Sequence, residues 1–406
     1  MNKSIHLIFP MSGQGVRFKE AGYKDPKPLI DVNGSPMIER LVNAFPQQWP
    51  CTFVVADNHL ETLLPKTLSS LRPHASILSI PPHKKGPLIA IIKALETINE
   101  NQPILISYCD YGIVWDPYHF QNFVSSTNCD ACVISYKGFH AHYHTETPYA
   151  YSLLNEFGQI IKVKEKGWFT DNREDEYASC GAYYFKNKEI LNQAIQFQID
   201  SNQQLNGEFY TSLTVEALLQ ANPNADVRIY EIPYFFQWGT PNDLESFIYW
   251  EKSYQSHFKW VDSNKLTPVD QIVIPMAGFG SRFKDITPLP KPLIPVDGQS
   301  MYKRALQTLP PSKKTICVTL KEIGKQLPLS DGIDYIELDK TPEGQALSVA
   351  ASQNLLKEKE NVLISSCDHG VVINPELWNT FCKLDNIDVL IFTLAFEIPV
   401  VTNHIL

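Results

Sequence analysis

Short apolar runs alternate with longer amphipathic segments over the first 250 residues of the chain. The apolar runs predict strands at 6–10, 52–56, 76–80, 103–108, 131–136, 149–155, 159–164, 179–185 and 227–232. Apolar residues at helical spacing predict helices at 37–44, 87–98, 188–197, 209–221 and 242–250. Strands that alternate with helices in this way are typical of an α/β fold, with a mixed, mainly parallel sheet flanked by helices.

The same pattern begins again in the second half of the chain. Residues 9–19 read FPMSGQGVRFK, residues 274–284 read IPMAGFGSRFK, and a Pro-Lys-Pro-Leu follows each of them. Residues 85–90 (KGPLIA) match 343–348 (EGQALS), and 105–112 (LISYCDYG) match 363–370 (LISSCDHG). Because the order and the spacing of these segments repeat, the sequence predicts a tandem duplication.

The two copies are unequal in length. We expect a complete domain at 1–250, a linker at 251–269 and a second, truncated domain at 270–406. The second copy has no counterpart of the residues after about 145, and it stops soon after its equivalent of the strand at 131–136. A sheet with an unpaired edge favours packing against another surface, so a homo-oligomer is one of the arrangements that the sequence allows.

Composition and charge narrow the classes of ligand. The net charge of −9 argues against broad binding to nucleic acid or to an anionic membrane. No run approaches the roughly 18 apolar residues of a membrane span, and the N-terminal apolar stretch is too short for a signal peptide. We therefore expect a cytoplasmic protein, whose site for a small anion needs only a few local cations.

Each copy carries a glycine-rich loop directly after a predicted strand. Gly13 and Gly15 allow a tight turn that presents backbone N–H groups to an anion. Arg17 follows, and Lys27 lies between two prolines that stiffen its loop. This combination suits a triphosphate. The second copy repeats it with Gly278, Gly280, Arg282 and Lys291.

Two further positions are candidates for nucleotide and metal binding. Asp110 follows a predicted strand beside the phosphate loop, where a carboxylate is a natural Mg²⁺ ligand, although a cap or turn is the alternative. Gly86 begins a predicted helix, where a small residue would let a flat base lie against the backbone, and plain helix entry is the alternative. Asp368 and Gly344 are their counterparts in the second copy.

Together these segments resemble the sugar-1-phosphate nucleotidyltransferases, or NDP-sugar pyrophosphorylases. The resemblance also includes Glu165-Lys166, Gly181 and the Gly-Thr-Pro at 239–241, all in the family's order. It implies a Rossmann-like nucleotidyltransferase fold, here duplicated. It also implies an Mg²⁺-dependent reaction of an NTP with a sugar 1-phosphate to give an NDP-sugar and pyrophosphate, in the service of surface polysaccharide synthesis.

The resemblance assigns roles to these residues. Arg17 and Lys27 would be catalytic, because they would stabilise charge on the phosphates and on the leaving pyrophosphate. Asp110 would bind the Mg²⁺. The nucleotide would be held by Gly13, Gly15 and Gly86, and the sugar phosphate by Glu165, Lys166 and Gly181.

The sequence also departs from the family pattern. The family usually has an aspartate, as a second metal ligand, where Gln237 stands two residues before Gly239. The second copy has the phosphate-binding half without the sugar-binding half. Two alternatives therefore stay open: a nucleotide-binding pseudoenzyme or regulatory protein, and a nucleotidyltransferase for another phosphorylated alcohol such as phosphocholine. The base, the acceptor and the role of the second copy are not fixed by the sequence.

Overall fold

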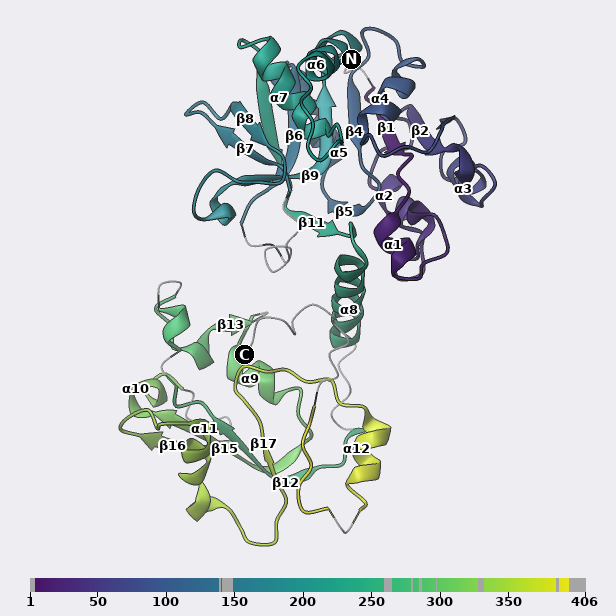
Figure 1. The fold of residues 1–406 in the computed structure, drawn as a ribbon. Coiled ribbons are helices and arrows are strands. Elements are labelled where there is room, and N and C mark those ends of the chain that lie inside the picture. Colours follow the sequence, from purple (N-terminus) through teal and green to yellow (C-terminus); the bar gives the residue numbers. More distant parts are fainter. Residues whose placement is uncertain are drawn as a thin grey trace. The chain divides into compact units, whose positions relative to one another are not determined.

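The chain divides into two compact units. The computed structural model describes residues 4–138, 140, 149–258, 265–278, 280–284, 287–296, 298–327, 332–384 and 387–393. One unit covers Met1–Trp250 and the other covers Glu251–Ala395, and we name them unit 1 and unit 2 (Figure 1). In the part of the chain that the structure describes, no helix is long and apolar enough to cross a membrane.

Unit 1 is built on a nine-stranded mixed sheet. Four neighbouring strands are parallel: β1 (His6–Met11), β2 (Cys51–Ala56), β3 (Ser76–Ile80) and β4 (Ile104–Ser107). The rest of the sheet comprises β6 (Ala131–Tyr136), β7 (Tyr151–Leu154), β8 (Ile160–Lys164), β9 (Tyr177–Phe185) and β10 (Val227–Glu231). The order is β10-β6-β9-β4-β1-β2-β3, and β9 runs antiparallel to both of its neighbours in this order. The expected fold class, a mainly parallel sheet flanked by helices, is confirmed.

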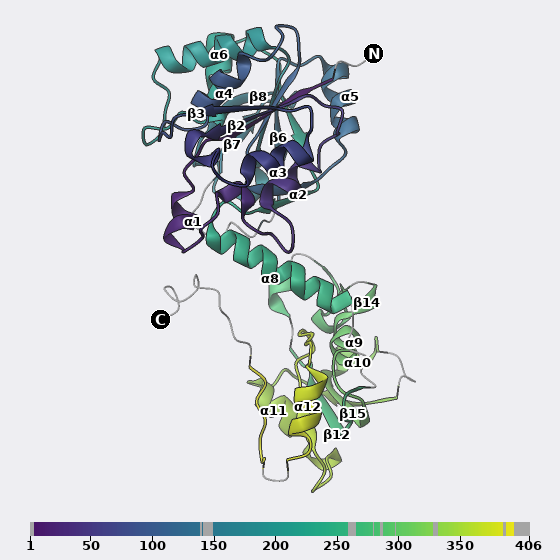
Figure 2. The ribbon, with the colours of Figure 1, turned by 90° about the vertical axis from the view of Figure 1, so that its right-hand side faces the viewer.

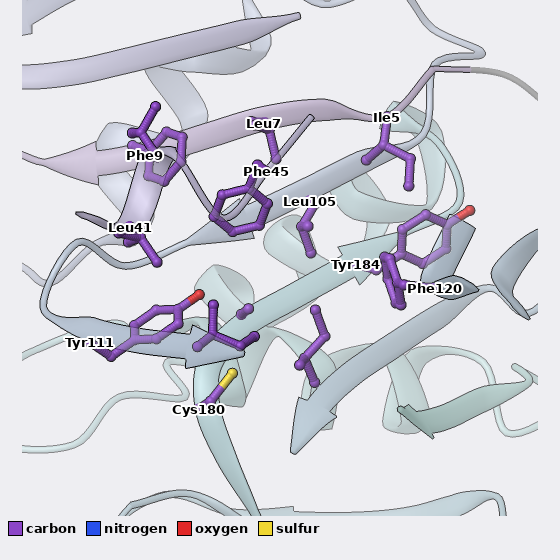
Figure 3. Close-up of a cluster of buried hydrophobic side chains, with 14 of the residues drawn as sticks. Ile5, Leu7, Phe9, Leu41, Phe45, Leu105, Tyr111, Phe120, Cys180 and Tyr184 are labelled. Atoms are coloured by element: carbon purple, nitrogen blue, oxygen red, sulfur yellow. The ribbon is translucent and has the colours of Figure 1, made fainter. Parts of the chain in front are cut away.

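Helices cover both faces of this sheet (Figure 2). Residues of α2 (Met37–Val42), α3 (Leu64–Leu71) and α5 (Pro117–Thr127) pack into one buried cluster, and residues of α4 (Leu88–Leu95), α6 (Lys188–Asp200) and α7 (Thr211–Ala221) pack into the other. Along β1, Leu7 and Phe9 belong to the first cluster and Ile8 to the second, because successive side chains of a strand point to opposite faces. Figure 3 shows Phe9 with Leu41 and Leu105 in the first cluster.

Several short elements were not anticipated from the sequence. Strands β5 (Tyr111–Val114) and β11 (Tyr234–Gln237) form a separate antiparallel pair, in which Gln237 lies opposite Tyr111. Helices α1 (Val16–Glu20), α3 and α5 also lie outside the expected segments. Helix α8 runs from Pro241 to Phe258, so the first part of the expected linker at 251–269 is helical. The segment contains no glycine or proline that would end the helix earlier.

Unit 2 repeats the order of the first four strands of unit 1. Its sheet contains β12 (Val269–Pro275), β15 (Ser312–Leu320), β16 (Ile333–Leu338) and β17 (Val362–Ile364), all parallel. The order β16-β15-β12-β17 corresponds to β3-β2-β1-β4 in unit 1. The other elements are the hairpin of β13 (Pro295–Val296) and β14 (Gln299–Ser300), and helices α9 (Met301–Leu306), α10 (Lys321–Gly324), α11 (Gln345–Ala350) and α12 (Pro375–Phe381).

The counterpart of strand β6 is not a strand in unit 2. Residues 387–393 carry the equivalent sequence, but they are irregular, and Val389 and Ile391 are about three-quarters exposed, at 76% and 75%. In unit 1, β6 is held between β9 and β10. The described residues of unit 2 include no equivalent of β9 or β10, so this segment lacks the partners that would hydrogen-bond its backbone.

Candidate active site

The glycine-rich loop of unit 1 follows β1 and turns directly into α1. Gly15 is the N-cap residue of α1 and has a left-handed backbone, with φ of 59°. A Cβ at this position would lie 3.3 Å from the Cβ of Lys27, so glycine also permits the close approach of the two loops. Phe18 is buried and anchors α1, whereas Arg17 on the same short helix is exposed. The guanidinium of Arg17 is therefore available to a ligand at this edge of the sheet.

Lys27 begins a short 3-10 helix, Lys27–Leu29, between its two prolines. Its Nζ donates to Oδ2 of Asp110 at 2.6 Å and to the carbonyl oxygen of Gly239 at 3.1 Å. The ammonium also lies 5.2 Å from the centre of the Phe18 ring. Lys27 thus connects its own loop with the segments that contain Asp110 and Gly239, beyond the carboxyl ends of β1 and β4.

Asp110 stays ionised in this setting. Burial alone would raise the pKa of Asp110, but the charges of Lys27 and Arg17 outweigh it and hold the pKa below its usual value. The carbonyl oxygen of Asp110 accepts a hydrogen bond from the backbone of Trp238 at 2.9 Å. The carboxylate is therefore fixed between the lysine loop and the strand pair β5–β11.

The residues around Gly239 form a second polar cluster. Nε2 of Gln237 donates to Oδ1 of Asp243 at 2.6 Å, and Oε1 of Gln237 accepts from the hydroxyl of Tyr149 at 3.2 Å. Oδ2 of Asp243 accepts from the backbone N–H and the hydroxyl of Thr240 at 3.2 and 2.7 Å. The Asp243 carboxylate is therefore already occupied by three donors, and its partner Gln237 has both ends of its amide bonded.

The carboxylates at this site suit a magnesium ion that is also bound by the phosphates of a substrate. Among the described residues, no three His, Cys, Asp or Glu side chains gather in a way that could enclose a metal. Mg²⁺ is commonly bound by one or two carboxylates together with substrate phosphates and water. Asp110 supplies one such carboxylate beside the phosphate loop, so the residues fit an ion that arrives with the nucleotide.

The predicted acceptor residues lie around the N-terminal turn of α7. Oε2 of Glu165 accepts from the hydroxyl of Ser212 at 2.5 Å, and burial raises the pKa of Glu165. Nζ of Lys166 donates to the hydroxyl of Tyr210 at 2.9 Å and lies 4.9 Å from the centre of its ring. Glu165 and Lys166 therefore reach the same turn of α7.

Gly181 and Gly86 both have backbones that favour glycine. Gly181 has φ of 94°, and a Cβ there would lie 3.1 Å from the ring of Tyr108. Gly86 has φ of 82°, and a Cβ there would lie 2.7 Å from the backbone N and O of Phe209. The glycine at position 86 thus allows the start of α4 to pack against the start of α7, close to Glu165 and Lys166.

The equivalent residues of unit 2 line one cavity of about 300 Å³. The cavity is bordered by all six residues expected there: Gly278, Gly280, Arg282, Lys291, Gly344 and Asp368. Nζ of Lys291 donates to Oδ2 of Asp368, which repeats the pairing of Lys27 with Asp110. The charge of Lys291 and a hydrogen bond from Ser366 hold the pKa of Asp368 below its usual value, against the effect of burial.

A family model described as the MobA-like NTP transferase domain matches residues 11–174 and 272–397, which make up more than half of the chain. The chain belongs to the MobA-like NTP transferase family. Each matched segment contains one glycine-rich loop, one Pro-Lys-Pro and one strand-end aspartate. A search of curated proteins finds no match.

Three solved structures of nucleotidyltransferases are each similar to 60–64% of this MobA-like chain. A nucleoside-diphosphate-sugar pyrophosphorylase from Vibrio cholerae is 18% identical, with a TM-score of 0.50, over 60% of this chain and 99% of that protein. A putative glucose-1-phosphate thymidylyltransferase from Bacillus anthracis is 14% identical, with a TM-score of 0.49, over 61% of this chain and 94% of that protein. A UTP-bound UGPase from Acinetobacter baumannii is 14% identical, with a TM-score of 0.47, over 64% of this chain and 100% of that protein. The first of these likenesses supports the nucleotidyltransferase fold.

Four polar residues near the site of this MobA-like domain were missed by the sequence analysis: Tyr149, Tyr210, Ser212 and Asp243. Only Asp243 had a local signal, because Thr240-x-x-Asp243 has the spacing of a capping box at the start of α8. The other three are brought to the site by the packing of α7 on the sheet and by the pairing of β11 with β5. No spacing in the sequence indicates those contacts.

Proposed function

We propose that unit 1 transfers a nucleotidyl group from an NTP to a sugar 1-phosphate and releases pyrophosphate. The observation that carries this proposal is the contact of Lys27 Nζ with Oδ2 of Asp110, at 2.6 Å, directly beside the glycine-rich loop. This contact gathers a cation and a metal-binding carboxylate at the place where the triphosphate would lie. Both copies carry the same pairing, which also supports an origin of the two units by tandem duplication.

The chemistry requires positioning and neutralisation of charge. An oxygen of the acceptor phosphate would attack the α-phosphorus of the NTP, and the bond from that phosphorus to the oxygen that bridges it to the β-phosphate would break. Two anions approach each other in this step, so fixed cations lower the barrier more than a covalent nucleophile would. Arg17 would bind the β- and γ-phosphates and the leaving pyrophosphate. Lys27 would neutralise the negative charge that develops on the phosphate oxygens nearest to Asp110.

Asp110 would hold Mg²⁺ together with the phosphates of the nucleotide, and the ion would supply further positive charge there. The Asp110 carboxylate is held by the ammonium of Lys27. On nucleotide binding, Lys27 would turn its ammonium from this carboxylate toward the phosphates, because a lysine carries its charge on a flexible stem.

The acceptor would bind between β8 and α7. Lys166 would bind the phosphate of the acceptor, Glu165 would accept hydrogen bonds from sugar hydroxyls, and Gly181 would line the pocket. The product, an NDP-sugar, is an activated donor of the kind that polysaccharide synthesis consumes.

Gln237 favours a second candidate, a nucleotide-binding protein that does not catalyse transfer. The amide is bonded at both ends, to Asp243 and to Tyr149, and it is a weaker metal ligand than a carboxylate. If the reaction needs two carboxylates around its metal, unit 1 would bind the nucleotide without turning it over.

One assay separates these candidates. The purified full-length protein is incubated with Mg²⁺, each of the four common NTPs and a panel of sugar 1-phosphates and phosphocholine, and pyrophosphate is measured. Release with a sugar 1-phosphate supports the leading proposal, and release only with phosphocholine supports the other acceptor class. Nucleotide binding without release from any pair would establish the second candidate and overturn the first.

A further inference from the structure

The start of α7 holds two side chains of the acceptor site proposed for unit 1. Tyr210 is the N-cap residue of this helix. Its hydroxyl accepts a hydrogen bond from Nζ of Lys166 at 2.9 Å. Two residues later, the hydroxyl of Ser212 donates to Oε2 of Glu165 at 2.5 Å. Neighbouring residues of one helix end therefore each contact a different member of the pair Glu165-Lys166.

The backbone of this helix end is itself fixed by buried hydrogen bonds. Gln198 is fully buried, and its Nε2 donates to the carbonyl oxygen of Tyr210 at 3.1 Å. The other end of the same amide accepts from the hydroxyl of Thr214 at 2.6 Å. On the preceding residue, the N–H of Phe209 donates to the carbonyl oxygen of Lys85 at 2.9 Å. A buried polar side chain that is bonded at both ends resists reorientation, so Tyr210 is a firm support for another side chain.

Lys166 has a fixed backbone and an exposed side chain. Its φ of 51° is in the left-handed region, which a residue other than glycine keeps only where its surroundings hold it there. The next residue, Gly167, pairs with Ala150 in an isolated β-bridge, and Nζ of Lys164 donates to the carbonyl oxygen of Trp168 at 2.9 Å. The side chain of Lys166 would otherwise adopt many rotamers, and a ligand that ordered it would lose binding free energy.

The hydroxyl of Tyr210 is suited to hold an ammonium group. It donates its proton to the carboxylate of Glu208, so its lone pairs face Lys166. Burial and the charge of Glu208 raise the pKa of Tyr210, so the hydroxyl stays protonated and keeps both bonds. The charge of Arg17 acts on this pKa in the opposite direction. Tyr210 is therefore within electrostatic reach of the cations proposed for both substrates.

We propose that Tyr210 is a positioning residue for the acceptor phosphate, whose hydroxyl holds the ammonium of Lys166 where that phosphate binds. This inference rests on the function proposed for unit 1, in which Lys166 binds the phosphate of the acceptor. An ammonium has three N–H donors, so one can stay on Tyr210 while two remain for phosphate oxygens. The phosphate then meets a cation that is already in place, and less rotamer entropy is lost on binding.

The Tyr210→Phe variant removes this hydroxyl and little else. The aromatic ring remains, together with its contact to the ammonium of Lys166 at 4.9 Å, so folding is retained. We expect the KM for the acceptor to rise about tenfold, because the lost hydrogen bond involves a charged group. The kcat and the KM for the NTP should stay within about twofold of the wild-type values. A fall in kcat with an unchanged KM for the acceptor would contradict the proposal.

Tyr118→Phe is the matched control. It removes an exposed hydroxyl on α5, which accepts from Nε2 of Gln48 at 2.8 Å. This substitution also deletes one hydrogen-bonded tyrosine hydroxyl from unit 1, but outside the proposed site. We expect the KM for the acceptor to be unchanged, and an increase equal to that of Tyr210→Phe would show that the effect is not specific to the acceptor site.

A binding measurement separates this proposal from the proposed transfer. The full-length protein is mixed with Mg²⁺, an α,β-methylene NTP that cannot be turned over, and each sugar 1-phosphate or phosphocholine, and ligand-observed NMR gives the Kd of the acceptor. We expect at least one acceptor to bind, about tenfold more weakly to Tyr210→Phe. Binding to the wild-type protein that never leads to pyrophosphate release would overturn the transfer and leave the role of Tyr210 standing. Binding of none of these acceptors would overturn the role of Tyr210.

A double-mutant cycle tests whether Tyr210 acts through Lys166. Lys166→Ala should weaken acceptor binding at least as much as Tyr210→Phe does. In the Lys166→Ala protein, Tyr210→Phe should change the Kd less than about twofold, because the hydroxyl has no ammonium left to hold. A structural role alone would give Tyr210→Phe the same fold-change in both backgrounds, and that result would overturn the proposal.

Discussion

At the scale of the residue, two carboxyl groups of unit 1 have pKa values that are shifted in opposite directions. Burial raises the pKa of Glu165, whereas the cations beside Asp110 overcome burial and lower its pKa. Opposite shifts in neighbouring parts of a site indicate different tasks. Asp110 is kept ionised, as the proposed metal ligand needs to be, and Glu165 takes up its proton at a higher pH than an ordinary glutamate.

Lys27 is the residue whose removal should be most costly to transfer. Lys27→Ala removes a cation from the proposed phosphate site and leaves the half-buried carboxylate of Asp110 without its main partner. We expect kcat to fall by about 10²–10³-fold, the range seen when one group that stabilises transition-state charge is removed. Pyrophosphate release under saturating substrates measures the effect. Lys24→Ala, which changes an exposed lysine of the same loop, is the matched control and should retain full activity.

Glu165 should give acceptor binding a pH dependence. Because its pKa is raised, Glu165 takes up a proton at a higher pH than an ordinary glutamate, and the neutral form accepts hydrogen bonds from sugar hydroxyls less well. The KM for the acceptor should therefore rise as the pH is lowered through this pKa. Glu165→Gln should show the raised KM at every pH, with a smaller change in kcat.

The hydroxyl of Ser212 allows a test of the direction in which the pKa of Glu165 controls acceptor binding. Its hydrogen bond stabilises the ionised form of Glu165, so it lowers the pKa that burial has raised. Ser212→Ala should therefore move the acidic limb of the kcat/KM profile for the acceptor to higher pH. A limb that stays in place, or that moves to lower pH, would show that Glu165 does not control acceptor binding.

At the scale of the element, the junction of β11 and α8 connects the cap of a helix to the candidate active site. Thr240 and Asp243 cap the start of α8 reciprocally, and the second oxygen of Asp243 holds the amide of Gln237. The lysine loop reaches the same junction through the carbonyl oxygen of Gly239. The helix start therefore fixes the backbone that Lys27 contacts.

Removal of the Asp243 carboxylate should destabilise unit 1. Asp243→Ala removes a cap worth about 1 kcal/mol and leaves the buried Nε2 of Gln237 without its acceptor, at a cost of about 1–3 kcal/mol, although Oε1 keeps its bond from Tyr149. We expect the free energy of unfolding of unit 1 to fall by about 2–4 kcal/mol in urea denaturation, the sum of these two terms. Asn242→Ala alters the neighbouring exposed residue and should cost far less. Equal effects of the two substitutions would rule out the capping role.

The elements also show which parts of the site the sequence could predict. The glycine loop, the lysine between prolines and Asp110 are each contained in a short segment, and the parallel strand order brings these segments to one edge of the sheet. Tyr149, Tyr210 and Ser212 could not be predicted, because they reach the site through contacts between elements far apart in the sequence. Strands β5 and β11 were missed since each is a four-residue strand outside the main sheet, with no run long enough to stand out.

At the scale of the whole molecule, the two units have the same order of strands in part of their sheets but differ in the number of described strands. In the parts of the chain that the structure describes, unit 1 buries side chains on both faces of a nine-stranded sheet, whereas the main sheet of unit 2 has four strands. Among the described residues, no strand pairs with the outer edge of β17, and Ile364 on that strand is exposed. In unit 1 the equivalent edge of β4 is covered by β9.

This difference predicts two unfolding transitions. A smaller unit buries a smaller fraction of its apolar surface, so unit 2 should be the less stable of the two and unfold at a lower urea concentration. Hydrogen exchange at increasing urea concentration, with peptides assigned to each unit, measures the two midpoints separately. Coincident midpoints for the peptides of the two units would mean that the two units unfold as one.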